Sequence, residues 1–116
     1  MSCIILVAED DVLIRNTARH LLQTDGHEVL VATNGFEALE LSREYKGTID
    51  MLLTDVRMPR MGGLELIQQI SQERPGIKIL VMAGRLTNEE LKQLPFLRKP
   101  FSPKMFRSRV RAVLGD

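Results

Sequence analysis

Short apolar segments alternate along the chain with segments whose apolar residues recur every three or four positions. The apolar segments have the length of β-strands, and the periodic ones have the spacing of amphipathic helices. The pattern predicts five strands, each followed by a helix. The predicted strands are 3–8, 27–32, 49–55, 77–83 and 95–99.

Capping residues mark where the helices begin. Asp10 or Asp11 can cap the first helix. The later helices are predicted at 34–45, 63–73, 87–94 and 102–114. The helix at 34–45 begins with Asn34 and Glu37 in a capping-box-like pair, and the helix at 87–94 begins with Thr87 and Glu90 as a capping box. The last helix begins with Ser102 before Pro103. Pro95 ends the fourth helix.

The strands 3–8, 49–55 and 77–83 are nearly continuous apolar runs. Such runs are typical of a parallel sheet with both faces covered by helices. Right-handed crossovers then give a doubly wound α/β sheet. No linker or repeat interrupts the pattern, so we expect one domain over residues 1–116. Sheets of this kind bind ligands beyond the carboxyl ends of their strands.

Composition fits a single globular domain, with 116 residues, 44% of them hydrophobic and 27% charged. The net charge of +1 shows no overall bias toward nucleic acid or membrane. One cysteine excludes an internal disulfide. No apolar run is long enough to cross a membrane, and the first residues lack the basic start of a signal peptide. We therefore expect a cytoplasmic protein.

Charged residues cluster where the predicted strands end. Glu9, Asp10 and Asp11 follow the first strand, Asp55 ends the third, and Lys99 ends the fifth. Carboxylates that lie close together repel unless a cation joins them, and Mg²⁺ suits such oxygen ligands. A carboxylate can accept a phosphoryl group, and a lysine can neutralise the transferred oxygens. The pattern predicts Asp55 as a nucleophile beside a metal site.

The segments "LVAEDD", "LLTDVRMP", "MGGLEL" and "FLRKPFS" stand in this order within residues 4–114. Together they resemble the receiver domain of two-component response regulators. The last segment is closer to receivers attached to hybrid histidine kinases than to DNA-binding regulators. The resemblance implies a flavodoxin-like sheet with strand order 2-1-3-4-5. It also implies a non-enzymatic switch that takes a phosphoryl group from a histidine kinase or phosphotransfer protein and acts on a downstream protein.

The resemblance also assigns roles to residues. Asp55 would be the phosphoacceptor and Lys99 would contact the phosphoryl group. Asp10 would hold Mg²⁺ directly and Glu9 through water, with the backbone carbonyl of Arg57 and the Asp55 carboxylate as further ligands. The family commonly has Asp where this chain has Glu9, so the acidic pair departs from the pattern by one methylene.

A second departure lies at the end of the fourth strand. The family usually places Ser or Thr there to bond the phosphoryl group, whereas this chain has Ala83. Gly84 still offers a backbone N–H to the phosphoryl group. The short stretch before Lys99 implies a shortened fourth helix. We therefore expect phosphorylation with a small or differently routed response, and we expect Arg57 and Arg85 at the rim of the site.

Three alternatives remain open. An enzyme with an aspartate nucleophile, like the haloacid dehalogenase-like phosphatases, would need a second acid where Arg57 stands. A pseudo-receiver would serve as an interaction module without phosphate, although intact Glu9, Asp10, Asp55 and Lys99 argue against it. DNA binding would use the basic last helix, with Lys104, Arg107, Arg109 and Arg111. These 116 residues contain no effector domain, so we expect that helix to contact protein instead. The oligomeric state is not predicted.

Overall fold

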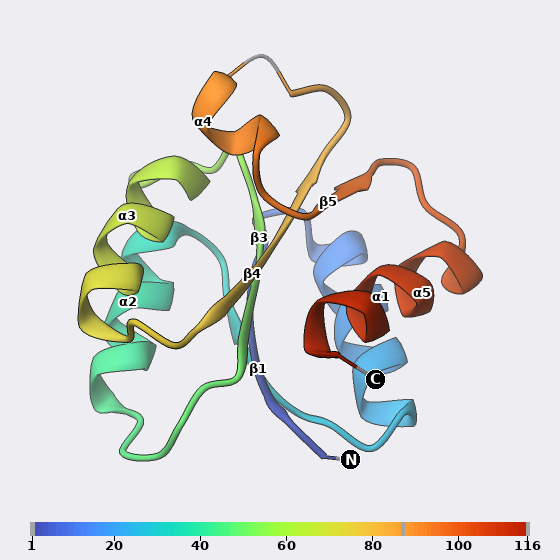
Figure 1. Ribbon diagram of the computed structural model, residues 1–116, viewed down its shortest axis with the longest axis horizontal. Helices are drawn as coiled ribbons and strands as arrows, with labels where there is room; N and C mark the ends of the chain where they lie inside the picture. Colours follow the sequence, from blue (N-terminus) through green and yellow to red (C-terminus); the bar gives the residue numbers. More distant parts are fainter. Residues whose placement is uncertain (1, 87, 116) are drawn as a thin grey trace.

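The computed structural model describes residues 2–86 and 88–115. Five parallel strands form one sheet in the order β2-β1-β3-β4-β5, which confirms the doubly wound, flavodoxin-like prediction. Helices α1 and α5 cover one face of the sheet, and α2 and α3 cover the other (Figure 1). The elements are β1 (Ile4–Ala8), α1 (Val12–Thr24), β2 (Glu28–Ala32), α2 (Gly35–Glu44), β3 (Met51–Asp55), α3 (Gly63–Glu73), β4 (Lys78–Ala83), α4 (Glu89–Lys92), β5 (Phe96–Arg98) and α5 (Pro103–Leu114).

Two hydrophobic cores lie on the two faces of the sheet. Alternate residues of a strand point to opposite faces, so Ile5 and Val7 of β1 join the core under α1 and α5, while Leu6 and Ala8 join the core under α2 and α3. All four of these side chains are fully buried. Burial on both faces explains why the inner strands are continuous apolar runs in the sequence.

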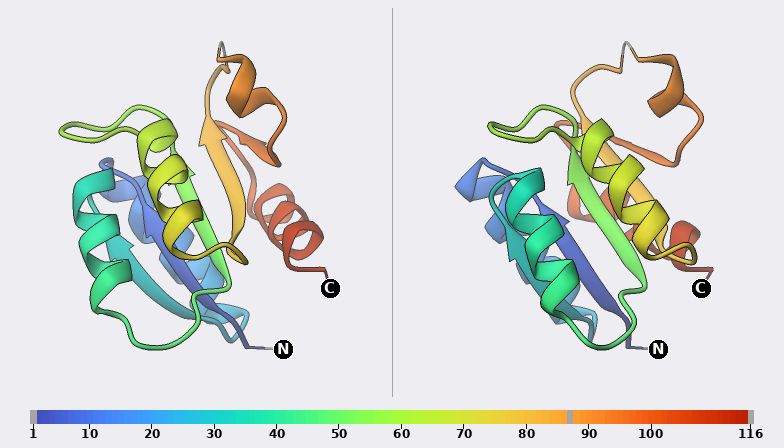
Figure 2. Two further views of the ribbon diagram at one scale, coloured as in Figure 1. Left: turned by 60° about the vertical axis from the view of Figure 1, so that its left-hand side comes forward. Right: turned by 90° about the vertical axis from the view of Figure 1, so that its left-hand side faces the viewer.

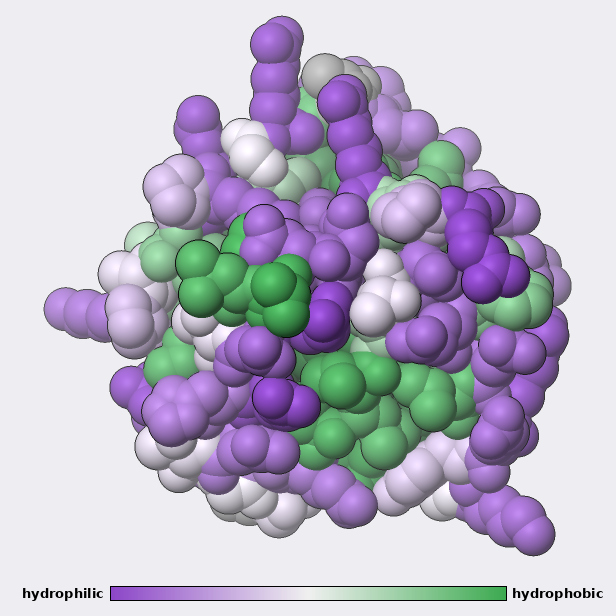
Figure 3. All heavy atoms as spheres, turned by 180° about the vertical axis from the view of Figure 1, so that it is seen from behind, coloured by the Kyte–Doolittle hydropathy of each residue, from purple (hydrophilic) through white to green (hydrophobic). Residues whose placement is uncertain are grey.

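The edges of the sheet are less deeply buried than its centre. Figure 3 looks onto the β2 edge, where hydrophobic side chains lie between polar surfaces. Residues 29–31 of β2 are half-buried there. Of the helices that the structure describes, none combines the length and hydropathy that a bilayer span needs.

Most predicted helix caps are confirmed. Asp11, rather than Asp10, caps α1 by accepting hydrogen bonds from the backbone N–H groups of Leu13 and Ile14. Asn34 accepts from the Glu37 N–H at 2.8 Å, and Glu37 reaches back to the preceding residue, Thr33. The Ser102 hydroxyl caps α5 by accepting from the Met105 N–H.

The fourth helix is shorter than the sequence pattern predicts. The pattern spans 87–94, whereas α4 is only four residues long, Glu89–Lys92. The proposed cap, Thr87, lies outside the described residues, and Asn88 accepts a hydrogen bond from the Glu90 N–H instead. Among the residues of α4, only Leu91 is buried. The helix therefore rests on one anchor at the carboxyl edge of the sheet (Figure 1).

Arg74 holds the opposite edge together. It follows α3 directly and donates hydrogen bonds to the Ser42 hydroxyl and carbonyl, the Tyr45 carbonyl and the Gly47 carbonyl, at 2.7–2.8 Å. The bonds to the Ser42 and Tyr45 carbonyls satisfy groups at the end of α2 that have no partner within that helix, and the bond to Gly47 holds the loop that follows. One side chain thus joins the ends of α2 and α3, which lie side by side in Figures 1 and 2.

The start of α3 packs tightly against the end of β3. The Gly63 N–H donates to the Val56 carbonyl at 2.8 Å. A Cβ at position 63 would overlap the carbonyl oxygen of Asp55 and crowd Val56. Glycine is required at this position by close approach, and the position of Asp55 depends on it.

We predict that Gly63→Ala lowers the free energy of unfolding by about 1–3 kcal/mol, because the added methyl group forces α3 away from β3. Urea unfolding measures this. The matched control is Gly76→Ala, since a Cβ there meets no atom within 4 Å. The control should change stability by less than about 0.5 kcal/mol. Equal effects of the two substitutions would contradict the close-packing explanation.

Candidate functional site

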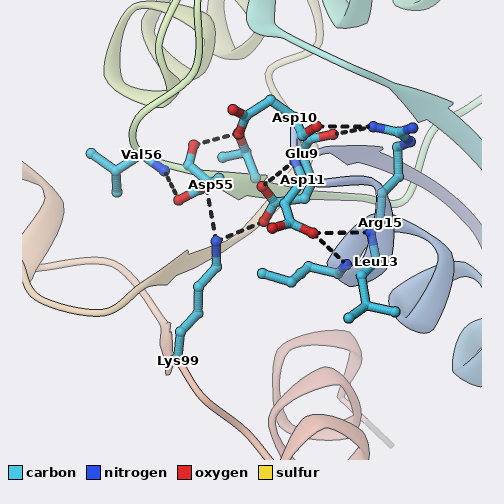
Figure 4. Close-up of polar contacts among 10 residues, drawn as sticks. Glu9, Asp10, Asp11, Leu13, Arg15, Asp55, Val56 and Lys99 are labelled. Carbon is cyan, nitrogen blue, oxygen red and sulfur yellow. Dashed lines mark hydrogen bonds and ion pairs between the residues drawn. The ribbon is translucent and has the colours of Figure 1, made fainter.

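Three carboxylates meet at the carboxyl edge of the sheet. Glu9 and Asp10 follow β1, and Asp55 ends β3, the strand that pairs with β1. One carboxylate oxygen from each residue lies within 4.8 Å of the other two. Glu9 is fully buried, the Asp55 side chain is 13% exposed, and Asp10 lies at the surface. Figure 4 shows the three side chains lying close together. The structure therefore brings together the acids that the sequence predicts.

Lys99 reaches these acids from the end of β5. Its Nζ donates to Glu9 Oε1 at 2.7 Å and to Asp55 Oδ2 at 2.8 Å (Figure 4). The lysine backbone N–H donates to the Ala83 carbonyl at 2.9 Å, which anchors Lys99 beside the end of β4. The side chain is 19% exposed. One ammonium group thus bridges a buried carboxylate and a partly exposed one.

Burial and pairing shift the pKa values in this cluster. Burial raises the pKa of Glu9 from 4.5 to about 7, although the hydrogen bond from Lys99 opposes the shift. Burial by itself would lower the pKa of Lys99, but its hydrogen bonds to Asp55 and Glu9 outweigh that effect and raise it. When all groups are ionised, the three carboxylates and the Lys99 ammonium together carry a net charge of −2.

Backbone groups orient the two paired carboxylates. The Val56 N–H donates to Asp55 Oδ1 at 2.8 Å, and the Asp11 N–H donates to Glu9 Oε2 at 3.2 Å. Arg15 of α1 donates to the Glu9 carbonyl at 2.9 Å and holds the turn after β1 (Figure 4). The sequence analysis missed Arg15. Its position four residues after the helix cap is the only signal, and many solvent-exposed arginines share it.

The cluster fits a hard divalent cation. Glu9, Asp10 and Asp55 offer carboxylate oxygens, and Mg²⁺ prefers oxygen ligands while needing only one or two carboxylates. The two positive charges of Mg²⁺ would balance the net charge of −2 on the cluster. Asp11 lies outside this group because its carboxylate caps α1. Whether the Arg57 carbonyl also binds the metal stays a prediction.

A cavity of about 360 Å³ opens beside Asp55. Arg57 and Arg85 both line it, which confirms that they lie at the rim of the site. The remaining wall consists of Asp55, Val56, Ala83, Gly84, Leu86, Asn88 and Leu91. The sequence analysis did not predict this cavity, because its size depends on how little of the edge the one-turn α4 covers.

Comparison with known proteins identifies the family. The protein-family model described as the response regulator receiver domain matches residues 5–111. The chain belongs to this family. Receiver domains are signalling modules of two-component systems, and they interact with histidine kinases or phosphotransfer proteins. They bind Mg²⁺ at an acidic pocket of the kind described above.

One relative of this receiver domain is the sensor kinase CckA of Brucella abortus (strain 2308), which is 34% identical over 119 residues. The alignment covers 97% of this chain but only 13% of that kinase. The chain spans about half the length of two curated regulators that it matches, PhoP of Bacillus subtilis (strain 168) and MprA of Mycobacterium ulcerans (strain Agy99).

Solved structures share the fold over almost the whole receiver domain. The receiver domain from the hybrid histidine kinase CckA superposes with a TM-score of 0.83 and 34% identity, covering 96% of this chain and 98% of that one. The response regulator protein TrrA from Thermotoga maritima, in complex with Mg(2+)-BeF, gives a TM-score of 0.84 and 26% identity, with coverage of 96% and 98%.

The raised pKa of Glu9 predicts a pH-dependent stability. Between about pH 4.5 and pH 7 the folded state binds the Glu9 proton more strongly than the unfolded state does. This contribution to stability is fully present below pH 4.5 and is lost as the pH rises to about 7. In Glu9→Gln, which cannot titrate, this part of the decline should disappear.

Urea unfolding at several pH values, in EDTA to remove divalent cations, tests this prediction. The control is Glu65→Gln, which removes an exposed carboxylate from the first turn of α3. The control should keep the slope of the parent protein between pH 4.5 and 7. A Glu9→Gln protein with the same slope as the parent would show that Glu9 titrates normally.

Proposed function

We propose that this receiver domain accepts a phosphoryl group on Asp55 from a histidine kinase or phosphotransfer protein. The observation that carries the proposal is the pairing of Asp55 with Lys99 at 2.8 Å, inside a cluster of three carboxylates. Asp55 is the member of the Lys99-bound pair that solvent can reach, since Glu9 is fully buried. A phosphodonor can approach it through the adjoining cavity.

The transfer forms one bond and breaks one. An Asp55 carboxylate oxygen attacks phosphorus, the P–N bond of the donor phosphohistidine breaks, and its electron pair returns to the imidazole nitrogen. Lys99 neutralises charge on the phosphoryl oxygens as the group arrives. Glu9, Asp10, Asp55 and the carbonyl of Arg57 are the groups that would hold Mg²⁺. The bound ion supplies positive charge to the same oxygens.

The surface beside the acids supports a protein donor. Val12 and Leu13 open α1 directly after the acidic turn, and they are 59% and 73% exposed. A hollow of about 350 Å³ next to them is lined by Leu13, Ile14, Thr17, Lys99, Pro100 and Phe101. Val12, Leu13 and this hollow adjoin one another, and contiguous exposed apolar surface is typical of protein contact sites.

Incubation with acetyl phosphate and Mg²⁺ tests the phosphoacceptor role. We expect the intact mass to rise by one phosphoryl group in the parent protein and to stay constant in Asp55→Asn, because an amide is a poor nucleophile. The mass increase should vanish in EDTA. A parent protein that never gains the mass would contradict the proposal and favour the pseudo-receiver alternative.

A second prediction distinguishes the role of Asp10 in Mg²⁺ binding from that of Asp11. Asp10→Asn should weaken Mg²⁺ binding and slow phosphorylation together, each by at least about tenfold, because the cation loses a charged ligand. Titration with Mg²⁺ by NMR gives the affinity, and intact mass over time gives the rate.

The matched control for Asp10→Asn is Asp11→Asn, which makes the same chemical change one residue later. Asparagine caps helices about as well as aspartate, so α1 should be retained. We expect parental Mg²⁺ affinity and phosphorylation rate in this control. Equal losses in the two variants would mean that overall negative charge, and not ligation by Asp10, controls the site.

A further inference from the structure

Residues 84–86 lie between two hollows. The cavity of about 360 Å³ on one side contains Asp55. The hollow on the other side has a volume of about 410 Å³ and is lined by Gly84, Arg85, Leu86, Lys92, Phe96 and Arg98. A Cβ added to Gly84 would meet no atom within 4 Å. The segment therefore has space on both sides, toward Asp55 and away from it.

Arg85 is the one cationic residue, among those that the structure describes, that lines both hollows. Arg57 lines only the Asp55 cavity, and Lys92 and Arg98 line only the second hollow. Within residues 2–86 and 88–115, the Arg85 side chain has no hydrogen bond or ion pair. No carboxylate of the described residues holds its guanidinium in either place. A phosphoryl group on Asp55 would therefore meet a nearby cation that has no competing partner.

The wall of the Asp55 cavity has few other donors to offer. Ala83 presents a methyl group where the family usually has a hydroxyl. The side-chain donors in the wall are Arg57, Arg85 and Asn88. Of these, Arg85 stands two residues beyond Ala83, on the segment that directly follows β4. Guanidinium groups also bind phosphoryl oxygens in a planar, two-pronged geometry that a single hydroxyl cannot match.

We propose that Arg85 replaces the missing hydroxyl as the group that couples phosphorylation to movement. The inference rests on the proposed phosphoacceptor function of Asp55. When Asp55 carries a phosphoryl group, the Arg85 guanidinium binds it and draws residues 84–86 from the second hollow toward the Asp55 cavity. Helix α4 follows, because Leu91 is its only buried residue and resists little. Before phosphorylation Lys99 already pairs with Asp55, so the carboxylate alone exerts no comparable pull on Arg85.

The test uses beryllofluoride with Mg²⁺ as a phosphoryl mimic on the full chain. Fluorine NMR reports whether the mimic is bound, and amide NMR reports whether residues 84–92 respond. The proteins are the parent, Arg85→Ala, Arg85→Lys and the double variant Arg85→Ala with Ala83→Thr. Arg98→Ala is the matched control, since it removes an arginine from the second hollow without touching the Asp55 cavity.

We expect all five proteins to bind the mimic. The loss of a hydrogen bond to a charged group should lower the population of the inward position roughly ten- to a hundredfold in Arg85→Ala, so most of the amide shift through 84–92 should vanish. Arg85→Lys should keep part of the amide shift, and Arg98→Ala should keep all of it. In the double variant, the hydroxyl that Ala83→Thr adds should restore the amide shift. Restoration would show that the segment is intact in Arg85→Ala and lacks only a donor.

Three results would overturn the inference, in distinguishable ways. If the parent and Arg85→Ala bind the mimic with the same amide shifts, Arg85 has no coupling role and the phosphoacceptor function stands. If the parent fails to bind the mimic, the phosphoacceptor function falls and the role of Arg85 falls with it. An equal loss of response in Arg98→Ala would also overturn the inference, because positive charge in general would then explain the effect.

Discussion

The ion pairs of Lys99 are the interaction on which the site depends. Glu9 is fully buried, and a buried carboxylate is costly unless it is paired. Lys99 supplies the pairing and reaches Asp55 at the same time. Because the lysine backbone is fixed to the Ala83 carbonyl, the cluster also fixes the spacing between the ends of β4 and β5. Chemistry and architecture therefore share one set of contacts at the carboxyl edge of the sheet.

Most of the fold could be predicted because the signals for its strands and helices lie in short stretches of sequence. Continuous apolar runs identified the buried inner strands, and helix caps at Asp11, Asn34 and Ser102 lay where the sequence placed them. Strand boundaries shifted by one or two residues, as with β3, which starts at Met51 and not at residue 49. The fourth helix was overestimated because its periodic pattern continues past Leu91, the only residue of α4 with a core to pack against.

The acids and lysine of the site were also predictable, since parallel strands bring their carboxyl ends to one edge. That rule placed Glu9, Asp55 and Lys99 together without any knowledge of distances. It could not reveal that Lys99 bonds to both acids, nor that Arg15 holds the turn after β1. These contacts depend on side-chain reach between elements far apart in the chain. The cavities around residues 84–86 were unpredictable for the same reason, because they are shaped by what α4 leaves uncovered.

The hydrogen bonds of Arg74 have a consequence for how such a domain can evolve. They lock the ends of α2 and α3 at the edge of the sheet that carries no chemistry. The carboxyl edge, over the residues that the structure describes, has no equivalent clamp on residues 84–86, which lie between open spaces. The Arg74 clamp and residues 84–86 therefore lie at opposite poles of the molecule. A side chain added at Gly84 would meet no atom within 4 Å, so a substitution there leaves the contacts of that clamp intact.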